Sequence, residues 1–167
     1  VTSAGDITLK LYPQKSPVTV KNFLAYVDSG FYNETIFHRV ISNFMVQGGG
    51  FTTAMTEKES GEPIVNESRN KLHNIRGTIA MARTSEPDSA TAQFFINQRS
   101  NLQLDWAPGK EGYTVFGEVE KGMGVVDFIA TADTDTGLMV TNAGQRPFQD
   151  VPVEAIVIKK VVRIPGK

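Results

Sequence analysis

Cysteine is absent from the 167 residues of the chain, and only two histidines, His38 and His73, are present. Without thiols the chain holds neither a disulfide framework nor a thiolate zinc site, and cysteine usage says nothing about its redox compartment. The two histidines stand far apart, and no HExxH motif joins them. We therefore expect no metal and no cofactor.

Motifs of several common enzyme classes are missing as well. The run Gly48-Gly49-Gly50 is not followed by the GK[ST] of a phosphate-binding loop, and no G-x-G-x-x-G is present. The three glycines accordingly predict a turn or a bulge. No G-x-S-x-G elbow supports a serine hydrolase. Catalysis by phosphate-loop or serine-nucleophile chemistry is therefore not expected.

The chain also has little net charge and no long apolar run. Its formal net charge is −1 at pH 7, which argues against an electrostatic footprint for nucleic acid or an anionic membrane. No apolar stretch approaches the roughly 18 to 20 residues that a membrane span needs. We expect neither nucleic acid nor a membrane as a partner. The length and the lack of repeats or linkers predict one domain over residues 1–167.

The hydrophobic pattern of the chain predicts mainly β-strands. Residues 6–11 alternate apolar and polar side chains, which is typical of a half-buried strand. A helix is expected from Ser16, whose hydroxyl suits the N-cap, and Pro17, which suits the first helical position, to a stop at Gly30. Further strands are expected at 77–82, 93–97, 113–119 and 153–164, a second helix at 122–130, and surface loops at 52–74 and 99–112. No strand is assigned to 133–150, which is polar and contains glycine.

The most informative stretch runs from Phe37 to Phe51 and sets one arginine and one glutamine among aromatic and aliphatic residues. Strand-forming residues lie on both sides of Ser42-Asn43, so Arg39 and Gln47 are expected on neighbouring strands. Side chains two residues apart share a face of a strand, which gathers an arginine, an amide and the Met45 thioether on one surface. This mixture of polar and apolar side chains on one face predicts a ligand-binding surface.

This stretch resembles the signature of the cyclophilin peptidyl-prolyl cis-trans isomerases. A second block, Gly77-Thr78-Ile79-Ala80-Met81-Ala82-Arg83 followed by Ala92-Gln93-Phe94-Phe95-Ile96-Asn97, is similar to the other hallmark of that family. The resemblance extends from about Ile7 to the C-terminal strand and is strongest to the bacterial single-domain enzymes. It implies a mainly β fold, a closed eight-stranded antiparallel β-barrel capped by two α-helices, with the active surface outside the barrel.

The chemistry of prolyl isomerisation suggests a role for the arginine. Rotation about a peptide bond meets a barrier of about 18–20 kcal/mol because the nitrogen lone pair is delocalised into the carbonyl. A guanidinium that donates a hydrogen bond to the prolyl nitrogen favours the twisted amide over the planar one. Arg39 is the candidate donor, although from the residues alone a strand arginine that packs its stem and pairs its head on the surface is equally expected. Only the resemblance favours the catalytic role.

The resemblance also implies the other site residues. Gln47 would hold the arginine and contact the substrate backbone. Phe44, Met45, Phe95 and Leu104 match the proline pocket, while Ala82, Arg83, Thr84 and Gln93 match the rim where the substrate backbone pairs with an exposed strand. Tyr113 aligns with the histidine that many relatives carry at the rim. His38 is expected on the face opposite Arg39, in a structural role.

Two functions from different classes remain after these steps. The first is a cofactor-independent isomerase that acts on Xaa-Pro bonds of unfolded or flexible proteins and assists their folding. The second is a proline-peptide binding module, or holdase, in which the same pocket binds without turnover. The intact Arg39 favours the enzyme, because a binding module has little need for this residue.

Departures from the eukaryotic pattern set further expectations. Gln103 aligns with the indole that contacts cyclosporin in many relatives, with Trp106 close by in the sequence, so we expect cyclosporin to bind weakly. We expect a monomer. The start at Val1 and the sequence Ala82-Arg83-Thr84 favour a location in the bacterial periplasm, with the cytoplasm as the alternative.

Overall fold

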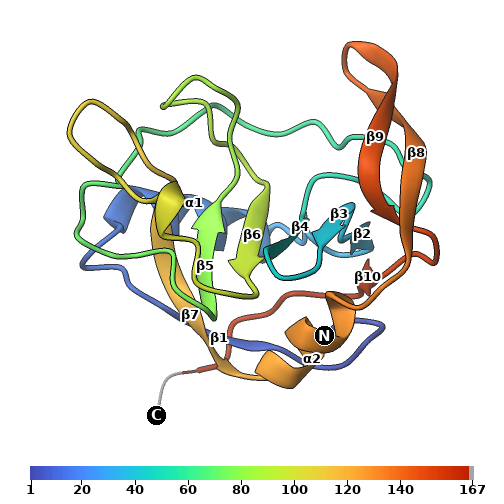
Figure 1. The fold of residues 1–167 in the computed structure, drawn as a ribbon, viewed down its shortest axis with the longest axis horizontal. Helices are drawn as coiled ribbons and strands as arrows, with labels where there is room; N and C mark the ends of the chain where they lie inside the picture. Colours follow the sequence, from blue (N-terminus) through green and yellow to red (C-terminus); the bar gives the residue numbers. More distant parts are fainter. Residues whose placement is uncertain (166–167) are drawn as a thin grey trace.

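The computed structural model describes residues 1–165, in which two α-helices accompany ten strands (Figure 1). The helices are α1 (Pro17–Asp28) and α2 (Met123–Ile129), and a short 3-10 helix, η1, spans Leu102–Leu104. The strands are β1 (Thr8–Leu11), β2 (Thr35–Ile36), β3 (Arg39–Ile41), β4 (Met45–Gly48), β5 (Thr78–Met81), β6 (Phe94–Asn97), β7 (Val115–Lys121), β8 (Thr134–Thr141), β9 (Gly144–Pro152) and β10 (Val157–Ile158). Neither helix in this part of the chain has the length and apolar character that crossing a membrane requires.

Six strands form one antiparallel sheet in the order β1-β7-β5-β6-β4-β3. The turn at Ser42-Asn43 joins β3 to β4 as expected, and Asn43 takes a positive φ of 58° there. Two further ribbons, β10-β2 and β8-β9, each contain two antiparallel strands. The chain from Thr52 to Asn74 contains no named strand and crosses the top of the molecule in Figure 1.

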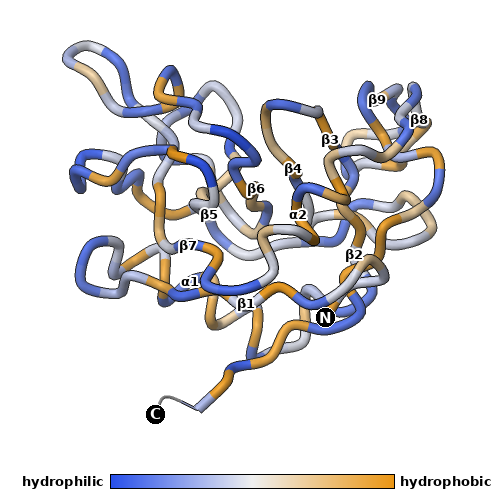
Figure 2. The backbone as a smooth tube through the Cα atoms, turned by 60° about the horizontal axis from the view of Figure 1, so that its bottom comes forward, coloured by the Kyte–Doolittle hydropathy of each residue, from blue (hydrophilic) through white to orange (hydrophobic). Residues whose placement is uncertain are grey.

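The side chains of the sheet alternate between two faces, as the period of a strand requires. One face carries Val46, Ile79, Phe94 and Phe116, which are at most 5% exposed and pack with residues of both helices in the main core. The other face carries Met45, Ala80, Phe95 and Val115, which form a separate buried cluster. Figure 2 shows apolar segments along the strands and hydrophilic ones in the projecting loops. We refer to the sheet face that carries Phe94 and Phe116 as the core face and to the one that carries Met45 and Phe95 as the site face.

The start of α1 is held by a residue distant in sequence. Ser16 is the N-cap residue, but it makes no side-chain cap; its hydroxyl instead donates to the Val115 carbonyl at 2.8 Å. The Glu67 carboxylate accepts from the first-turn amides of Val18, at 3.3 Å, and Thr19, at 2.7 Å. The expected capping role of Ser16 was therefore wrong, because a carboxylate from the long loop reaches the free amides first.

The largest departure from the expected elements is the β8-β9 hairpin. It rises beside β3 at the right of Figure 1, and Met139 and Val151 anchor it in a small cluster with Ile36 and Phe51. Beyond this anchor most of its residues are exposed, so the segment has the polar composition of a loop although its backbone is paired. Composition was misleading here because the pairing needs few buried side chains.

The final strand is shorter than the expected 153–164. Only Val157–Ile158 form a named strand, which pairs with β2, and the consecutive Lys159 and Lys160 interrupt the apolar-polar alternation at that point. A cavity of about 900 Å³ lies between β1, α1 and the C-terminal segment, with Phe23, Phe37 and Phe94 among its lining residues.

Candidate active site

Arg39 and Gln47 lie directly opposite each other on β3 and β4, and Gln47 lies opposite Phe95 on β6. All three side chains project on the site face. Gln47 Nε2 donates to Gln93 Oε1 at 3.1 Å, which links two of the predicted site residues. Within residues 1–165 the Arg39 guanidinium has no hydrogen-bond or ion-pair partner, so its donors remain free for a ligand.

The glycine run makes room for this amide pair. A Cβ on Gly50 would stand 2.5 Å from Cγ of Gln93, and one on Gly49 would stand 2.8 Å from the Phe94 ring. Real Cβ contacts are not this short, so both positions require glycine. Gly49 also has a φ of +85°. The turn expected at 48–50 therefore brings the backbone close to Gln93.

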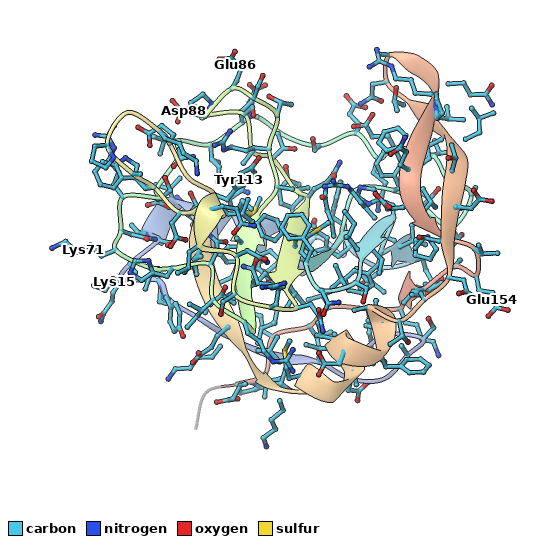
Figure 3. All side chains as sticks on the ribbon, viewed as in Figure 1. Lys15, Lys71, Glu86, Asp88, Tyr113 and Glu154 are labelled. Carbon is cyan, nitrogen blue, oxygen red and sulfur yellow. The ribbon has the colours of Figure 1, made fainter. Side chains whose placement is uncertain are left out.

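The four residues predicted to form a proline pocket lie together. Met45 and Phe95 are 2% and 4% exposed, and the half-buried Phe44 and Leu104 pack against them, as do Tyr113 and Ala82. The Phe95 and Tyr113 rings meet edge to face with centroids 5.8 Å apart. The result is an apolar surface bordered by Arg39 and Gln47, as a ring without a hydrogen-bond donor requires. Figure 3 labels Tyr113 above the strands of the sheet.

The predicted rim divides into two parts. Ala82 donates from its backbone to the Gln93 carbonyl at 3.0 Å, so these two residues lie side by side next to Gln47. Arg83 instead lies over the Tyr113 ring at 4.4 Å and donates to the carbonyls of Glu111, at 3.1 Å, and Gly112. Its charged end therefore holds the 111–113 loop rather than standing free in the groove.

Thr84 begins an exposed turn at the edge of the groove. Its hydroxyl bonds to Ser89 Oγ at 2.8 Å, and the Thr84 backbone amide donates to the same oxygen at 3.0 Å. Glu86 and Asp88, labelled in Figure 3, lie on the same projecting turn. The turn is thus closed by its own hydrogen bonds, and only its edge borders the site.

A buried chain of asparagines supports the pocket and was missed by the sequence analysis. Asn101 Nδ2 donates to the Phe44 carbonyl and to Asn97 Oδ1, both at 2.9 Å. Asn97 Nδ2 donates to Asn74 Oδ1 at 3.0 Å, and Asn74 Nδ2 donates to Asp105 Oδ1 at 3.0 Å and the Tyr113 carbonyl at 3.3 Å. The chain of amides thus connects Phe44 to Tyr113 through the interior.

Asp105 terminates this chain as a charged acceptor. Its burial alone would raise the carboxyl pKa, but hydrogen bonds from the backbone and side chain of Asn74 and from His73 hold the pKa below its ordinary value. An ionised acceptor strengthens the hydrogen bonds that it receives. The only sequence signal for the network was the repetition of asparagine just after the Phe94-Phe95-Ile96 motif, and a single sequence does not distinguish such residues from surface asparagines.

Gln103 and Trp106, the two candidates for the rim indole position, occupy different places. Gln103 lies in η1 and lines a cavity together with Phe44. Trp106 is 38% exposed, and the Arg69 guanidinium lies over its ring at 5.4 Å. Of the two, Gln103 therefore borders the predicted pocket.

His38 precedes Arg39 but lies on the other side of the chain. It is 2% exposed, and its ring lies 4.7 Å from that of Phe51. Burial, and secondarily the charge of Arg39, lowers its pKa to about 4. The imidazole is therefore neutral at pH 7 and packs in the interior, away from the groove.

The arrangement contains no conventional nucleophile beside a base, and in residues 1–165 no three metal-ligating side chains gather. It offers a free guanidinium, an amide and an apolar cup. Comparison with known proteins identifies the class of protein to which this site belongs. The model of the cyclophilin type peptidyl-prolyl cis-trans isomerase family matches residues 1–162. The chain belongs to this family, and it is an enzyme that isomerises Xaa-Pro peptide bonds.

Individual relatives agree with the family match. The chain is 56% identical over 158 residues to peptidyl-prolyl cis-trans isomerase A of Dickeya dadantii, covering 95% of this chain and 79% of that protein. It is 51% identical over 164 residues to isomerase B of Escherichia coli, covering 96% and 94%. A crystal structure of a Cryptosporidium parvum cyclophilin type isomerase, determined in the presence of the dipeptide Ala-Pro, superimposes with a TM-score of 0.78 at 28% identity over 99% and 97% of the chains. The mainly β fold with two helices is thus the cyclophilin fold.

Proposed function

We propose that Arg39 accelerates isomerisation by donating a hydrogen bond to the prolyl nitrogen as the amide twists. The observation that carries this proposal is the free guanidinium beside an apolar cup, opposite Gln47 and next to Phe95. In the planar amide the lone pair is delocalised and accepts poorly, whereas in the twisted amide it is localised on nitrogen. The hydrogen bond is therefore stronger in the transition state than in the ground state, which is the condition for a higher rate.

The remaining site residues hold the substrate in this proposal. Phe44, Met45, Phe95 and Leu104 receive the prolyl ring, and the backbone beside Ala82 and Gln93 pairs with the residues that precede proline. The substrates are proline-containing segments of unfolded or flexible proteins, and the Ala-Pro dipeptide of the Cryptosporidium structure supports a ligand of this kind. Gln47 keeps its place through its hydrogen bond to Gln93. No cofactor enters the mechanism.

A protease-free exchange-NMR assay on a short Xaa-Pro peptide tests the catalytic assignment. The intact protein should broaden and exchange the cis and trans signals, and Arg39→Ala should abolish most of this exchange while the peptide still shifts resonances of the pocket. Binding by the intact protein without any exchange would instead support a proline-peptide holdase. Gln145→Ala, in the exposed part of β9, is a control that should leave the exchange unchanged.

We also propose that the sheet closes into an eight-stranded barrel. The six-stranded sheet and the β10-β2 pair together supply eight strands. A bridge from Thr2 to Ile158 and a hydrogen bond from the Ser3 amide to the Val157 carbonyl, at 2.8 Å, tie β10 to the segment before β1. Slow hydrogen exchange of the Ser3 and Lys159 amides, which donate across this seam, would support closure, and rapid exchange would contradict it.

Periplasmic location and a monomeric state stay predictions. Fractionation of cells that produce the protein from its own gene tests the first, with the cytoplasm as the alternative outcome. Sedimentation at micromolar concentration tests the second.

A further inference from the structure

A second cavity adjoins the predicted proline pocket and is polar where the pocket is apolar. It has a volume of about 360 Å³ and is lined by Asn43, Phe44, Arg99, Ser100, Asn101 and Gln103. This volume is at the small end of the range for ligand sites and amply holds one extended side chain. Phe44 belongs to both the cavity and the pocket cluster, so the two share a wall.

Arg99 brings an uncompensated charge to this cavity. Arg69, Arg76 and Arg163 each form an ion pair with a carboxylate, whereas in the part of the chain that the structure describes Arg99 forms none. No acidic residue lines the cavity. The other polar lining groups are amides and a hydroxyl, which donate and accept hydrogen bonds but do not neutralise a cation. The cavity therefore favours an anionic group.

Hydrogen bonds fix the walls of the cavity. The Phe44 carbonyl accepts from the Gln98 amide at 3.0 Å and from Asn101 Nδ2 at 2.9 Å. Asn101 is 2% exposed and belongs to the asparagine chain that also reaches Tyr113. The segment that carries Arg99 is thus attached by its backbone and by Asn101 to the wall of the proline pocket.

The position of the cavity relative to β6 indicates which part of a substrate reaches it. Gln93, at the rim that receives residues before proline, precedes β6; Phe95, in the pocket, lies within it; and Arg99 follows its end. A peptide that crosses the site face from the rim over Phe95 therefore continues toward Arg99 after the proline. An extended chain advances about 3.3 Å per residue, so we place the first residue after proline across the shared Phe44 wall and the second residue at the cavity.

We infer that Arg99 and this cavity form a substrate subsite that selects an acidic side chain at the second residue after proline. The inference rests on the proposed function and adds to it a preference on the C-terminal side of the isomerised bond. Arg99 acts here as a specificity residue and takes no part in the twisting of the amide.

Exchange NMR on matched peptides tests this inference. The peptides are Gly-Ala-Ala-Pro-Ala-Xaa-Ala with Xaa as Glu, Gln or Lys, and both the Kd and the rate at saturation are measured. An exposed ion pair is worth up to about 1 kcal/mol, so the wild type should bind the Glu peptide about two- to five-fold more tightly than the Gln peptide. The rate at saturation should be the same for both. Because the contact is exposed, 0.5 M salt should remove the preference.

Variants separate this contact from the general field of the protein. Arg99→Gln should equalise the Glu and Gln peptides, and Arg99→Glu should reverse the preference toward the Lys peptide. Lys15→Gln, which removes one positive charge at the left edge of the molecule in Figure 3, should keep the wild-type preference. Equal affinity of the wild type for the Glu and Gln peptides, or a preference that survives Arg99→Gln, would overturn the subsite. Absence of catalysed exchange on every peptide would instead overturn the proposed catalytic role of the site.

Discussion

The two faces of the six-stranded sheet are built from the same strands but are held in different ways. On the core face, Phe94 and Phe116 join Phe23 of α1 through aromatic contacts with centroids 5.1 to 5.8 Å apart. On the site face, apolar side chains are partly covered by loops, and a chain of buried amides keeps those loops in place. Burial of apolar surface is non-directional, whereas hydrogen bonds fix orientation.

This difference separates stability from function along each strand. A core aromatic contributes by its buried area, and the loss of that area is felt by the whole fold. A residue on the site face contributes to function through the direction of its side chain, and its loss changes the binding or the turnover of the substrate. Substitutions on adjacent residues of one strand should therefore have unlike consequences.

The largest effect is expected on the core face. Phe116→Ala should lower the free energy of unfolding by about 3–5 kcal/mol, because a side chain that is 0% exposed leaves a cavity. Urea denaturation measures this loss. The molecules that remain folded should isomerise peptides at nearly the wild-type rate, and a low rate in the folded fraction would show that the two faces are not independent.

Arg39→Ala on the site face should have the opposite profile. Loss of a donor that acts mainly in the transition state should lower kcat roughly 100-fold, with the peptide Kd changed little and the urea midpoint nearly unchanged. Arg39→Lys is the matched control: it keeps the charge but not the planar fork, so it should recover little activity. Equal losses in rate and in binding would assign Arg39 to holding the peptide.

His38 should connect stability to pH although it is next to Arg39. Its pKa is about 4 in the folded protein and near 6.5 when exposed, so as the pH falls from 6.5 to 4 only the unfolded chain takes up the proton. Stability is then full above pH 6.5 and falls by roughly 3 kcal/mol by pH 4. Urea midpoints from pH 7 to 4.5 measure the slope. His38→Gln should flatten it.

Cyclosporin binding tests the edge of the site face. With Gln103 rather than an indole next to Phe44, inhibition should be weak, and Gln103→Trp should tighten it by about 2 kcal/mol, roughly 30-fold. Trp106→Ala should change it little, because Trp106 lies under Arg69. Inhibition titrations measure both effects. Tight inhibition of the wild type that disappears in Trp106→Ala would assign the contact to the other residue.

Much of the local structure could be predicted from the sequence because it depends on short patterns. The helix that begins at Pro17, the turn at Ser42-Asn43 and the strands around Ile79 and Phe95 lie where periodicity and turn residues indicated. Prediction failed at β8-β9, a polar hairpin that Met139 and Val151 anchor, and at 159–164, where a segment with three basic residues forms no ladder. In both segments, contacts with distant residues outweighed composition.

The sequence by itself determined the alternation that divides Arg39 from His38 and Phe95 from Phe94, because the side-chain period of a strand is a local property. It also carried the two motifs of the family. Only the tertiary structure decided that Glu67 caps α1, that three asparagines from separate segments join Phe44 to Tyr113, and that Gln103 rather than Trp106 lies beside the pocket. These are contacts between residues far apart in the chain, and a hydrogen bond or a shared cavity exists only once folding has set their distances and directions.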